Sequence, residues 1–149
     1  MKAARILGLK PIGTVRNHVK EPTVGGWAKV TSRLEVDKEY AGGLQGLEGY
    51  THVTVVYWMN QVDSCTITHV PQGREDVPEV GIFACRCPTR PNPIGISTAE
   101  LLGVRKNQLT VKGLDAIDGT PIVDIKPYTP QYDLRERARV PKWVNRLEY

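Results

Sequence analysis

The sequence predicts one mainly β domain, a small barrel with one or two short helices and no Rossmann fold. Several short stretches have strand-like apolar patterns, and Gly and Pro punctuate the gaps between them. No long window carries the 3.6-residue apolar period of a helix, and neither a GxGxxG nor a GxxxxGK[ST] motif occurs. At 149 residues the chain fits a single domain, residues 1–149, with no room for an additional C-terminal domain.

Three stretches carry the strand pattern most clearly. Residues 28–37 alternate between apolar and polar side chains, which predicts a half-buried strand. Residues 51–59 are almost continuously β-branched or aromatic, which predicts a central strand covered on both faces. Residues 108–114 alternate again, and the turn signal Asp118-Gly119 before residues 121–125 predicts a β-hairpin.

Other stretches are shorter or ambiguous. Residues 6–15 and 79–84 are further strand candidates. Residues 132–139 are a candidate helix, whereas residues 97–102 fit either a strand or a helical turn, because Ser97 and Glu100 have the spacing of a capping box.

Composition limits the compartment and the partners. No apolar run approaches the roughly 20 residues that span a bilayer, and the first residues lack the apolar core of a signal peptide, so we expect a cytoplasmic protein without a membrane partner. The net charge is +4 and the pI about 9.0, which is compatible with an anionic partner. Basic residues crowd the last fifteen positions: Arg135, Arg137, Arg139, Lys142 and Arg146.

Residues 81–97 are the most unusual stretch. Three prolines within six residues fix their own φ angles and push the preceding residues towards extended geometry, so this loop should be stiff. Arginine and asparagine side chains are spaced among the prolines, and a stiff loop holds such side chains in place. From these residues alone, a binding site and a plain crossover between strands remain open.

Two familiar chemistries fit poorly. Cys85 and Cys87 would point to one face of a strand instead of folding around an ion, so we expect two buried thiols and no metal site. Ser97 lies in a sequence close to GxSxG, but Ala99 replaces the last glycine, and all three histidines precede the serine, contrary to the order in that hydrolase fold.

Two long motifs nevertheless resemble one known family. The segment FACRCPTRPNPIGIS at residues 83–97 is similar to the first signature of the TsaA-like (TrmO) family. The segment LDAIDGTPIVDIKPY at residues 114–128 resembles its second signature, in the right order and at the right distance. Further matches near Ile12, Gly46 and His52 extend the resemblance over roughly residues 10–130.

The resemblance implies a small β-barrel methyltransferase that uses S-adenosylmethionine and works as a homodimer, with the cofactor near the subunit interface. It implies that the substrate is tRNA carrying threonylcarbamoyladenosine beside the anticodon, methylated on the exocyclic nitrogen. A noncatalytic barrel that binds RNA, and an enzyme acting on another small nucleotide, are the alternatives.

The resemblance also implies site residues. Those implied for the cofactor are Asn60, Gln61, Arg86, Ile96, Asp115, Ala116, Ile117 and Asp118. The first two occupy the positions of a His-Gln pair that is usual in the family, and Cys85 and Cys87 stand where the family usually has Thr and Ser.

The remaining roles follow from chemistry. The acceptor nitrogen is barely nucleophilic while protonated, so a base should help, and Asp118 is the first candidate, followed by Asp115 and Tyr128. The substrate contacts that we expect are Arg90, Asn92 and Lys126.

Overall fold

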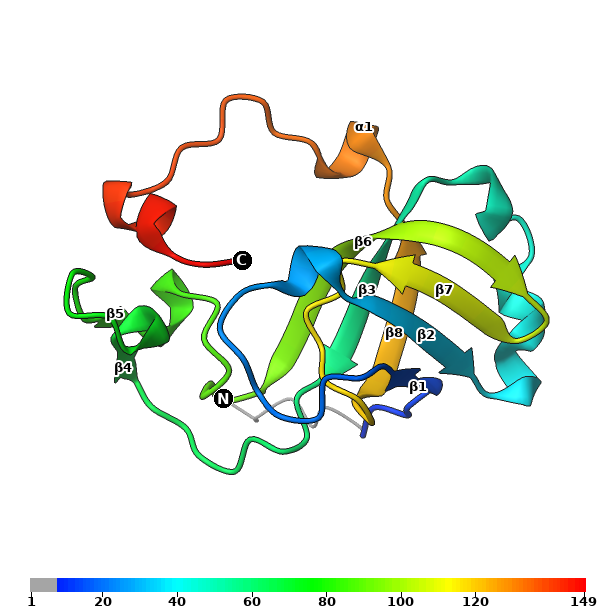
Figure 1. Cartoon of the computed structure of the whole chain (residues 1–149), viewed down its shortest axis with the longest axis horizontal. Helices are drawn as coiled ribbons and strands as arrows, with labels where there is room; N and C mark the ends of the chain where they lie inside the picture. Colours follow the sequence, from blue (N-terminus) through cyan, green and yellow to red (C-terminus); the bar gives the residue numbers. More distant parts are fainter. Residues whose placement is uncertain (1–7) are drawn as a thin grey trace, which may run out of the picture.

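The computed structural model describes residues 8–149 as a closed β-barrel with a small lobe at its side. Figure 1 shows the barrel joined to the lobe by connections at the bottom of the view, and a C-terminal segment that arches over from the barrel to the lobe. The predicted mainly β barrel is thus confirmed. No helix among these residues is long and apolar enough to cross a membrane.

The elements follow one another along the chain in short pieces. The barrel strands are β1 (Gly13–Arg16), β2 (Thr31–Val36), β3 (His52–Trp58), β6 (Ile94–Arg105), β7 (Gln108–Lys112) and β8 (Pro121–Pro127). The lobe holds β4 (Thr68–His69) and β5 (Val80–Gly81). The helices are α1 (Pro130–Asp133) and the 3₁₀ turns η1 (Trp27–Lys29), η2 (Lys38–Leu44), η3 (Leu47–Gly49), η4 (Pro71–Gly73), η5 (Ile82–Ala84) and η6 (Lys142–Arg146).

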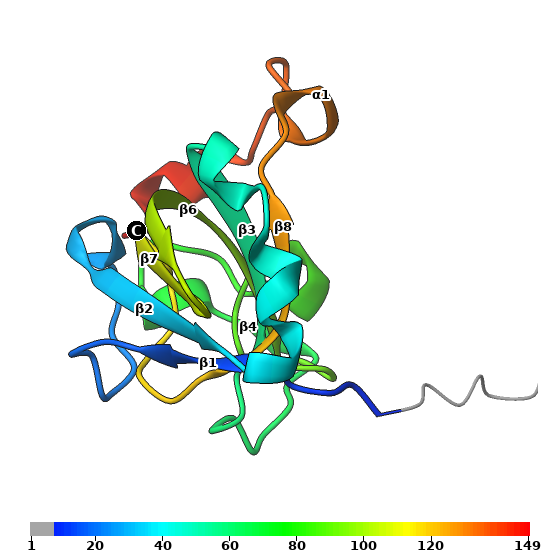
Figure 2. The same cartoon turned by 90° about the vertical axis from the view of Figure 1, so that its right-hand side faces the viewer.

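The barrel closes in the order β1-β2-β7-β6-β3-β8, with every neighbouring pair antiparallel. Figure 2 shows these strands wrapping around a common interior. The longest ladder joins β3 to β6, from His52 opposite Glu100 to Trp58 opposite Ile94. The ladder between β1 and β8 has only two residue pairs, so β8 depends mainly on β3 for its backbone hydrogen bonds.

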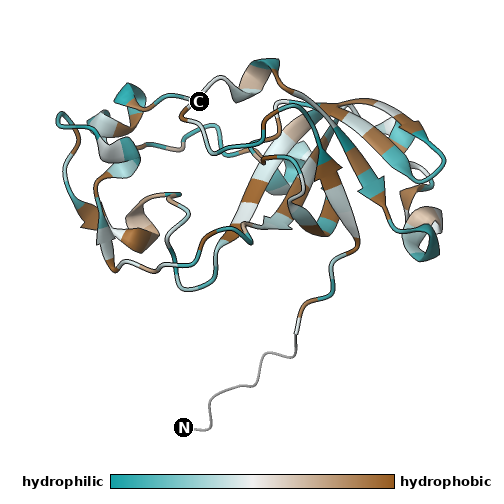
Figure 3. Ribbon diagram, turned by 60° about the horizontal axis from the view of Figure 1, so that its bottom comes forward, coloured by the Kyte–Doolittle hydropathy of each residue, from teal (hydrophilic) through white to brown (hydrophobic). Residues whose placement is uncertain are grey.

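Period-two patterning accounts for the barrel interior. Ser32, Leu34 and Val36 of β2 point inwards and are buried, as the alternation in residues 28–37 predicts. Figure 3 shows the same alternation as bands of opposite hydropathy along the strands. On β3 the inward residues are buried and the outward ones only half-buried, so this strand is covered fully on one face, not on both. The largest interior side chains are Leu34, Leu109, Leu114, Ile122, Val15, Val53, Val55 and Val111.

Two local predictions need correction. Residues 108–114 and 121–125 do form β7 and β8, but these strands do not pair: β7 lies between β2 and β6, and β8 lies between β1 and β3. The turn at Asp118-Gly119 is real, with Gly119 at φ 84°, yet it redirects the chain across the barrel end instead of closing a hairpin.

Other ambiguous stretches are settled by the ladders. Residues 97–102 are strand, because they lie within β6 and pair with both β3 and β7. Of residues 132–139 only the beginning is helical, in α1, and the chain from 134 to 141 is irregular. The stretch 79–84 is a two-residue strand followed by η5. Residues 6 and 7 lie outside the described part, and the rest of the stretch 6–15 contributes the first residues of β1.

The lobe has its own small core, which consists of Ile82, Cys85 and Cys87 with Val80 packed against them. The structure joins the two cysteines in a disulfide, with their Cα atoms 5.4 Å apart, which corrects the expectation of two buried thiols. Cys65 is exposed and free. The residue between the bonded cysteines, Arg86, is therefore presented on a loop that is constrained on both sides.

One close contact fixes how β3 packs against β6 near the end of β3 and the start of β6. Tyr57 faces Gly95 across the ladder, and a Cβ atom at Gly95 would lie 2.1 Å from the Tyr57 ring. The ring cannot retreat, because it is buried and its hydroxyl is hydrogen-bonded on both sides. Only glycine fits at position 95 while Tyr57 keeps this place.

We therefore expect Gly95→Ala to reduce the free energy of unfolding by about 2–3 kcal/mol, as overpacking does in a tight core. The matched control is Gly103→Ala on the same strand, where a Cβ atom would meet nothing within 4 Å. Urea unfolding followed by tryptophan fluorescence measures both variants. Equal stability of the two would contradict the argument.

Candidate functional site

The candidate site lies at the end of the barrel where β3 ends and β6 and β8 begin. Tyr57 pairs there with Gly95 on one side and with Ile122 on the other. Two loops leave this end: residues 59–93, which include the lobe, and residues 113–120, which join β7 to β8. The motif at residues 83–97 begins in the first loop, and the motif at residues 114–128 begins in the second. The fold therefore brings the first halves of the two motifs together.

Arg86 projects from the lobe towards the barrel. Its Nη2 atom donates a hydrogen bond to the backbone carbonyl of Ile96 on β6, which sets the guanidinium beside the start of that strand. No carboxylate within residues 8–149 lies in ion-pair range of Arg86. The guanidinium is exposed, so its remaining donors are free for an anionic ligand.

Tyr57 connects the strand to the second loop. Its hydroxyl donates a hydrogen bond to the backbone carbonyl of Asp115 and accepts one from Ser97 Oγ at 3.2 Å. Burial raises the pKa of Tyr57 to about 12, and the charge of Asp115 adds to this effect, while the Ser97 hydrogen bond and Arg86 oppose it. Tyr57 therefore stays protonated at neutral pH and serves as a fixed donor.

Asp115 presents a carboxyl group near Arg86 without an ion pair between them. Burial raises the pKa of Asp115 above its ordinary value of 3.8, and the nearby positive charge of Arg86 only partly counters this. Asp115 is nevertheless an exposed residue, so its carboxyl group is open to solvent and to a ligand. A carboxylate that is easier to protonate than usual suits proton transfer.

Asp118 has a different environment. Its Oδ2 atom accepts a 2.7 Å hydrogen bond from Lys20 Nζ, and its Oδ1 atom accepts one of 3.0 Å from the backbone N–H of Asn17. The Lys20 hydrogen bond, followed by that from Asn17, holds the pKa of Asp118 below its usual value. Both oxygens are thus engaged in joining the loop to residues 17–20.

The loop between β7 and β8 is held by further bonds to the same segment. Asn17 Nδ2 donates to the carbonyl of Ala116 at 2.8 Å and to Ser32 Oγ at 2.9 Å. The carbonyl of Ile117 accepts a 2.8 Å bond from Thr120 Oγ1. Ala116 is buried, whereas Ile117 is half-buried. Of the four cofactor residues expected in this loop, only Asp115 has a polar side chain that forms no hydrogen bond within residues 8–149, and the charge of Arg86 acts on it.

The proline-rich loop is stiffened by Arg90. Its Nη1 atom donates to the carbonyls of Cys85 at 3.0 Å and Cys87 at 3.1 Å, so this arginine braces the turn that carries Arg86. The backbone N–H of Met59 donates to the carbonyl of Pro93 at 2.8 Å, which ties the loop to the end of β3. Asn92 is exposed on this loop.

Asn60 and Gln61 follow β3 directly and are exposed at the same end of the barrel. Ile96, whose carbonyl holds Arg86, exposes its own side chain. The structure thus places Asn60, Gln61, Arg86, Ile96 and Asp115 at one end of the molecule.

Two predicted residues lie at the other end. The backbone N–H of Tyr128 donates to the carbonyl of His52, which begins β3, whereas Tyr57 is near its end. Lys126 pairs with Asp124 at 2.8 Å and faces Thr54 across the ladder. Tyr57 lies five positions beyond His52 on the strand, a span of about 17 Å. Within one chain, therefore, Tyr128 and Lys126 are remote from Arg86.

Sequence reasoning missed three residues that build the site: Tyr57, Ser97 in its hydrogen-bonding role, and Asn17. Tyr57 lies in the strand predicted from residues 51–59, where an aromatic residue looks like ordinary core. A glycine at position 95 hints at a close approach, but the sequence does not show what approaches. Asn17 acts through backbone carbonyls a hundred positions away, which leaves no local pattern.

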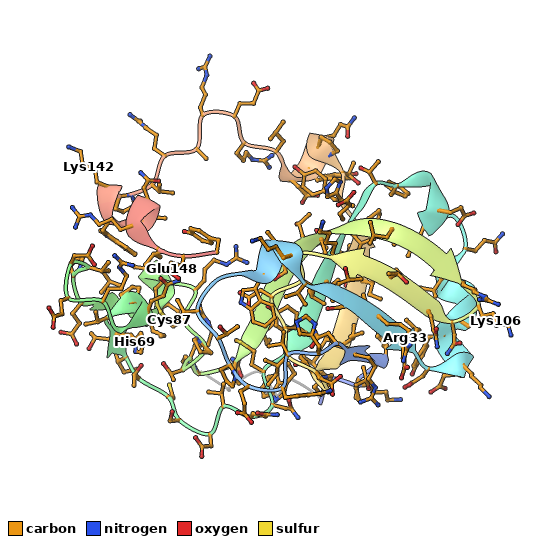
Figure 4. The ribbon with its side chains drawn as sticks, in the orientation of Figure 1. Arg33, His69, Cys87, Lys106, Lys142 and Glu148 are labelled. Carbon is orange, nitrogen blue, oxygen red and sulfur yellow. A yellow bond between two sulfur atoms is a disulfide. The ribbon has the colours of Figure 1, made fainter. Side chains whose placement is uncertain are left out.

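The side-chain view in Figure 4 places Cys87 in the lobe beside Glu148, far from Arg33 and Lys106 at the other side of the barrel. Among residues 8–149, no group of three or more His, Cys, Asp or Glu side chains could hold a metal ion. What the site offers is one free guanidinium, one carboxyl group with a raised pKa, exposed amides and an aliphatic edge.

Comparison with known proteins identifies the family of the chain. Residues 15–134 match the sequence model of the tRNA-methyltransferase O N-terminal domain. The chain belongs to this family. An Archaeoglobus fulgidus protein named S-adenosyl-L-methionine-binding protein is 41% identical over 129 residues, which cover 84% of this chain and 91% of the relative. A Pyrococcus abyssi protein named as a probable S-adenosyl-L-methionine-binding protein is 35% identical over 147 residues, covering 93% of this chain and 79% of its own length.

Crystal structures of members of the tRNA-methyltransferase O family have the same fold. TrmO from Pseudomonas aeruginosa gives a TM-score of 0.77 at 30% identity, over 95% of this chain and 63% of the crystallised one. A second structure of TrmO from Pseudomonas aeruginosa gives 0.72 at 31% identity, over 89% and 60% respectively. The chain thus spans less than two-thirds of these crystallised relatives.

Proposed function

We propose that this protein transfers a methyl group from S-adenosylmethionine to the exocyclic nitrogen of threonylcarbamoyladenosine beside the anticodon in tRNA. Membership of the tRNA-methyltransferase O family and the names of the relatives support the donor and the class of acceptor. The observation that carries the proposal is the pairing of Arg86 and Asp115 at one barrel end, close but not neutralising each other. Because the substrate is tRNA, the reaction belongs to the cytoplasm.

The residues at this end fit S-adenosylmethionine in kind. The guanidinium of Arg86 suits the amino-acid carboxylate of the cofactor. The carboxyl group of Asp115 suits the positive charges of the cofactor. Asn60 and Gln61 add amide donors and acceptors, and the exposed side chain of Ile96 offers an apolar contact. When bound, the cofactor supplies an electrophilic methyl group on a sulfonium.

The chain's own contribution is to position the reactants and to take up a proton. In-line displacement depends on alignment, and a loop braced by Arg90 and by the backbone bond from Met59 to Pro93 holds Arg86 in place. The acceptor nitrogen must lose its proton, and Asp115 is the better base, because the pKa of its carboxyl is raised whereas that of Asp118 is lowered. Asp118 then positions the loop through Asn17 and Lys20.

We further propose that the enzyme is a homodimer with the cofactor near the interface, as the family resemblance implies. The second motif runs from Leu114 to Tyr128, and its Asp115 and Tyr128 lie at opposite ends of the barrel. A partner copy could bring its Tyr128 and Lys126 to the Arg86 end, where both halves of the motif would then serve one site. Arg90 and Asn92, on the proline-rich loop, would face the tRNA there.

Removing Arg86 tests the cofactor site. We expect Arg86→Ala to weaken S-adenosylmethionine binding by about 10- to 100-fold, since a charge-assisted pair is lost, while the fold survives because the side chain is exposed. Calorimetric titration measures the affinity, with Arg105→Ala on the distant side of the barrel as the control. No binding by the unmodified protein even at high ligand concentration would favour a noncatalytic RNA-binding barrel.

Replacing the two aspartates separately identifies the base. We expect Asp115→Asn to lower kcat by at least about 100-fold with a smaller effect on cofactor affinity, whereas Asp118→Asn should cost less. A base must be deprotonated, so the wild-type rate should fall as the pH drops through the pKa of Asp115, which lies above 3.8. The Asp118→Asn variant should show the same fall in rate at low pH. Loss of turnover in Asp118→Asn alone would make Asp118 the base.

Mixing inactive variants tests the shared site. If Arg86 of one copy works with Tyr128 of the other, coexpressed Arg86→Ala and Tyr128→Phe chains should recover about a quarter of the wild-type methylation rate, from the one intact site of each mixed dimer. The control mixes Arg86→Ala with Asp115→Asn, whose sites lie at the same end of one chain and should not complement. A monomer in analytical ultracentrifugation would refute the dimer.

A further inference from the structure

The segment after α1 has no evident role in folding. Residues 134–149, here called the C-terminal strap, leave the barrel near Tyr128 and arch over to the lobe (Figure 1). Every residue from 130 to 142 is exposed, including the apolar side chains of Tyr132, Leu134 and Val140. A segment that buries so little contributes little to the core, so its composition is free to serve a partner.

The charge of the protein is concentrated on this strap. Residues 135–146 hold five basic side chains and one acidic one, which leaves fifteen basic and fifteen acidic residues in the rest of the chain. These twelve residues therefore account for the whole net charge of +4, and Glu148 near the end of the strap lowers the charge of the strap itself to +3. Arg135, Arg137, Arg139 and Lys142 form no ion pair with any residue between 8 and 149.

The strap is fastened at both ends instead of hanging free. Just before α1, the backbone N–H of Tyr128 donates a 3.0 Å hydrogen bond to the carbonyl of His52 on β3. Near the end of the strap, Gln72 Nε2 donates to the carbonyl of Glu148 at 2.7 Å, and the N–H of Glu148 donates to Gln72 Oε1 at 3.0 Å. The N–H of Gly26 adds a 2.9 Å bond to the last carbonyl, that of Tyr149.

Between these anchors the strap forms a small hollow. The N–H of Ala138 donates to the carbonyl of Arg135 at 3.0 Å, which closes a turn with Glu136 and Arg137 at its centre. A shallow, open depression of the surface lies against this turn, lined by both arginines, by Glu136 and by the apolar side chains of Pro130 and Leu134. Cationic and apolar walls together suit a ribose-phosphate unit.

We propose that the C-terminal strap is the element that holds the RNA, with Arg135, Arg137, Arg139 and Lys142 on the phosphate backbone. RNA as the occupant rests on the proposed function, and the position of the contact rests on the charge and geometry of the strap. The strap runs from the end of the barrel that carries Tyr128 to the lobe that carries Arg86 (Figure 1). RNA held along it therefore extends from the Arg86 end of one proposed site to the Tyr128 end, which in the proposed dimer serves the other site. Because the strap is anchored, little ordering entropy opposes binding.

Two charge-matched triple variants test the proposal. The strap variant is R135Q/R137Q/R139Q, and the control variant, R105Q/K106Q/K112Q, removes the same charge from exposed cations of β6, β7 and their turn. Figure 4 shows Lys106 at the opposite side of the molecule from Lys142. Neither set contributes to the core, so both variants should fold.

Binding is measured by fluorescence anisotropy with a labelled, unmodified tRNA transcript over a range of salt concentrations. We expect the strap variant to bind about 30-fold more weakly near physiological salt and to lose about two units of slope in the plot of log affinity against log salt. The control variant should stay within about threefold of wild type. Equal weakening of both, no weakening of the strap variant, or no tRNA binding by the wild type would overturn the proposal.

Vesicle binding, methylation kinetics and calorimetry separate the possible failures. If the strap variant loses binding to anionic phosphatidylserine vesicles while tRNA binding is kept, the strap serves a membrane surface and the proposal fails. If wild type methylates tRNA and the strap variant has the same kcat/KM, the strap proposal fails and the proposed function stands. If tRNA binding depends on the strap but calorimetry detects no S-adenosylmethionine binding, the strap proposal stands and the methyltransferase function fails.

Discussion

The contact between the Tyr57 ring and Gly95 is the constraint on which the site depends. Because position 95 has no side chain, the ring lies across β6 and its hydroxyl reaches the carbonyl of Asp115 in the loop between β7 and β8. That bond joins the two motifs, which are far apart in the chain. Without it, neither Ser97 nor the Asp115 backbone would have a fixed partner at this end of the barrel.

Asp115 and Asp118, in the loop between β7 and β8, have different electrostatic environments and therefore different roles. Asp118 is neutralised by Lys20 and bonded by the Asn17 backbone, so it is stabilised as a carboxylate and holds the loop. Asp115 has no such partner, and burial raises its pKa. Arg86 lies near enough to affect Asp115 but is held by the Ile96 carbonyl instead of by the carboxylate. Two opposite charges are thus kept available for a ligand at this end of the barrel.

The sequence was a good guide to the strands and a partial guide to the site. Alternation in residues 28–37 identified β2 and its buried face, because period two follows directly from strand geometry. The predicted hairpin at Asp118-Gly119 was wrong, because a local turn signal does not tell which strands will pair. The roles of Tyr57, Asn17 and Lys20 could not be predicted, since each depends on a partner at least forty positions away. The position of Tyr128 at the far end of β8 also followed from the fold alone.

The separation of charge from the core fits the proposal that one short chain combines a stable barrel with a surface for a polyanion. A barrel interior excludes cations, and like charges gathered on its wall would repel one another across short strand spacings. Placing the excess charge on an exposed strap avoids both costs, while the anchors at Gln72 and Gly26 keep the strap from collapsing onto the barrel or trailing away. The lobe and the barrel end then keep Arg86 and Asp115 for the smaller ligand. The strap thereby supplies the long-range attraction for the polyanion, and the barrel end supplies the chemistry. A substitution in either segment leaves the other undisturbed.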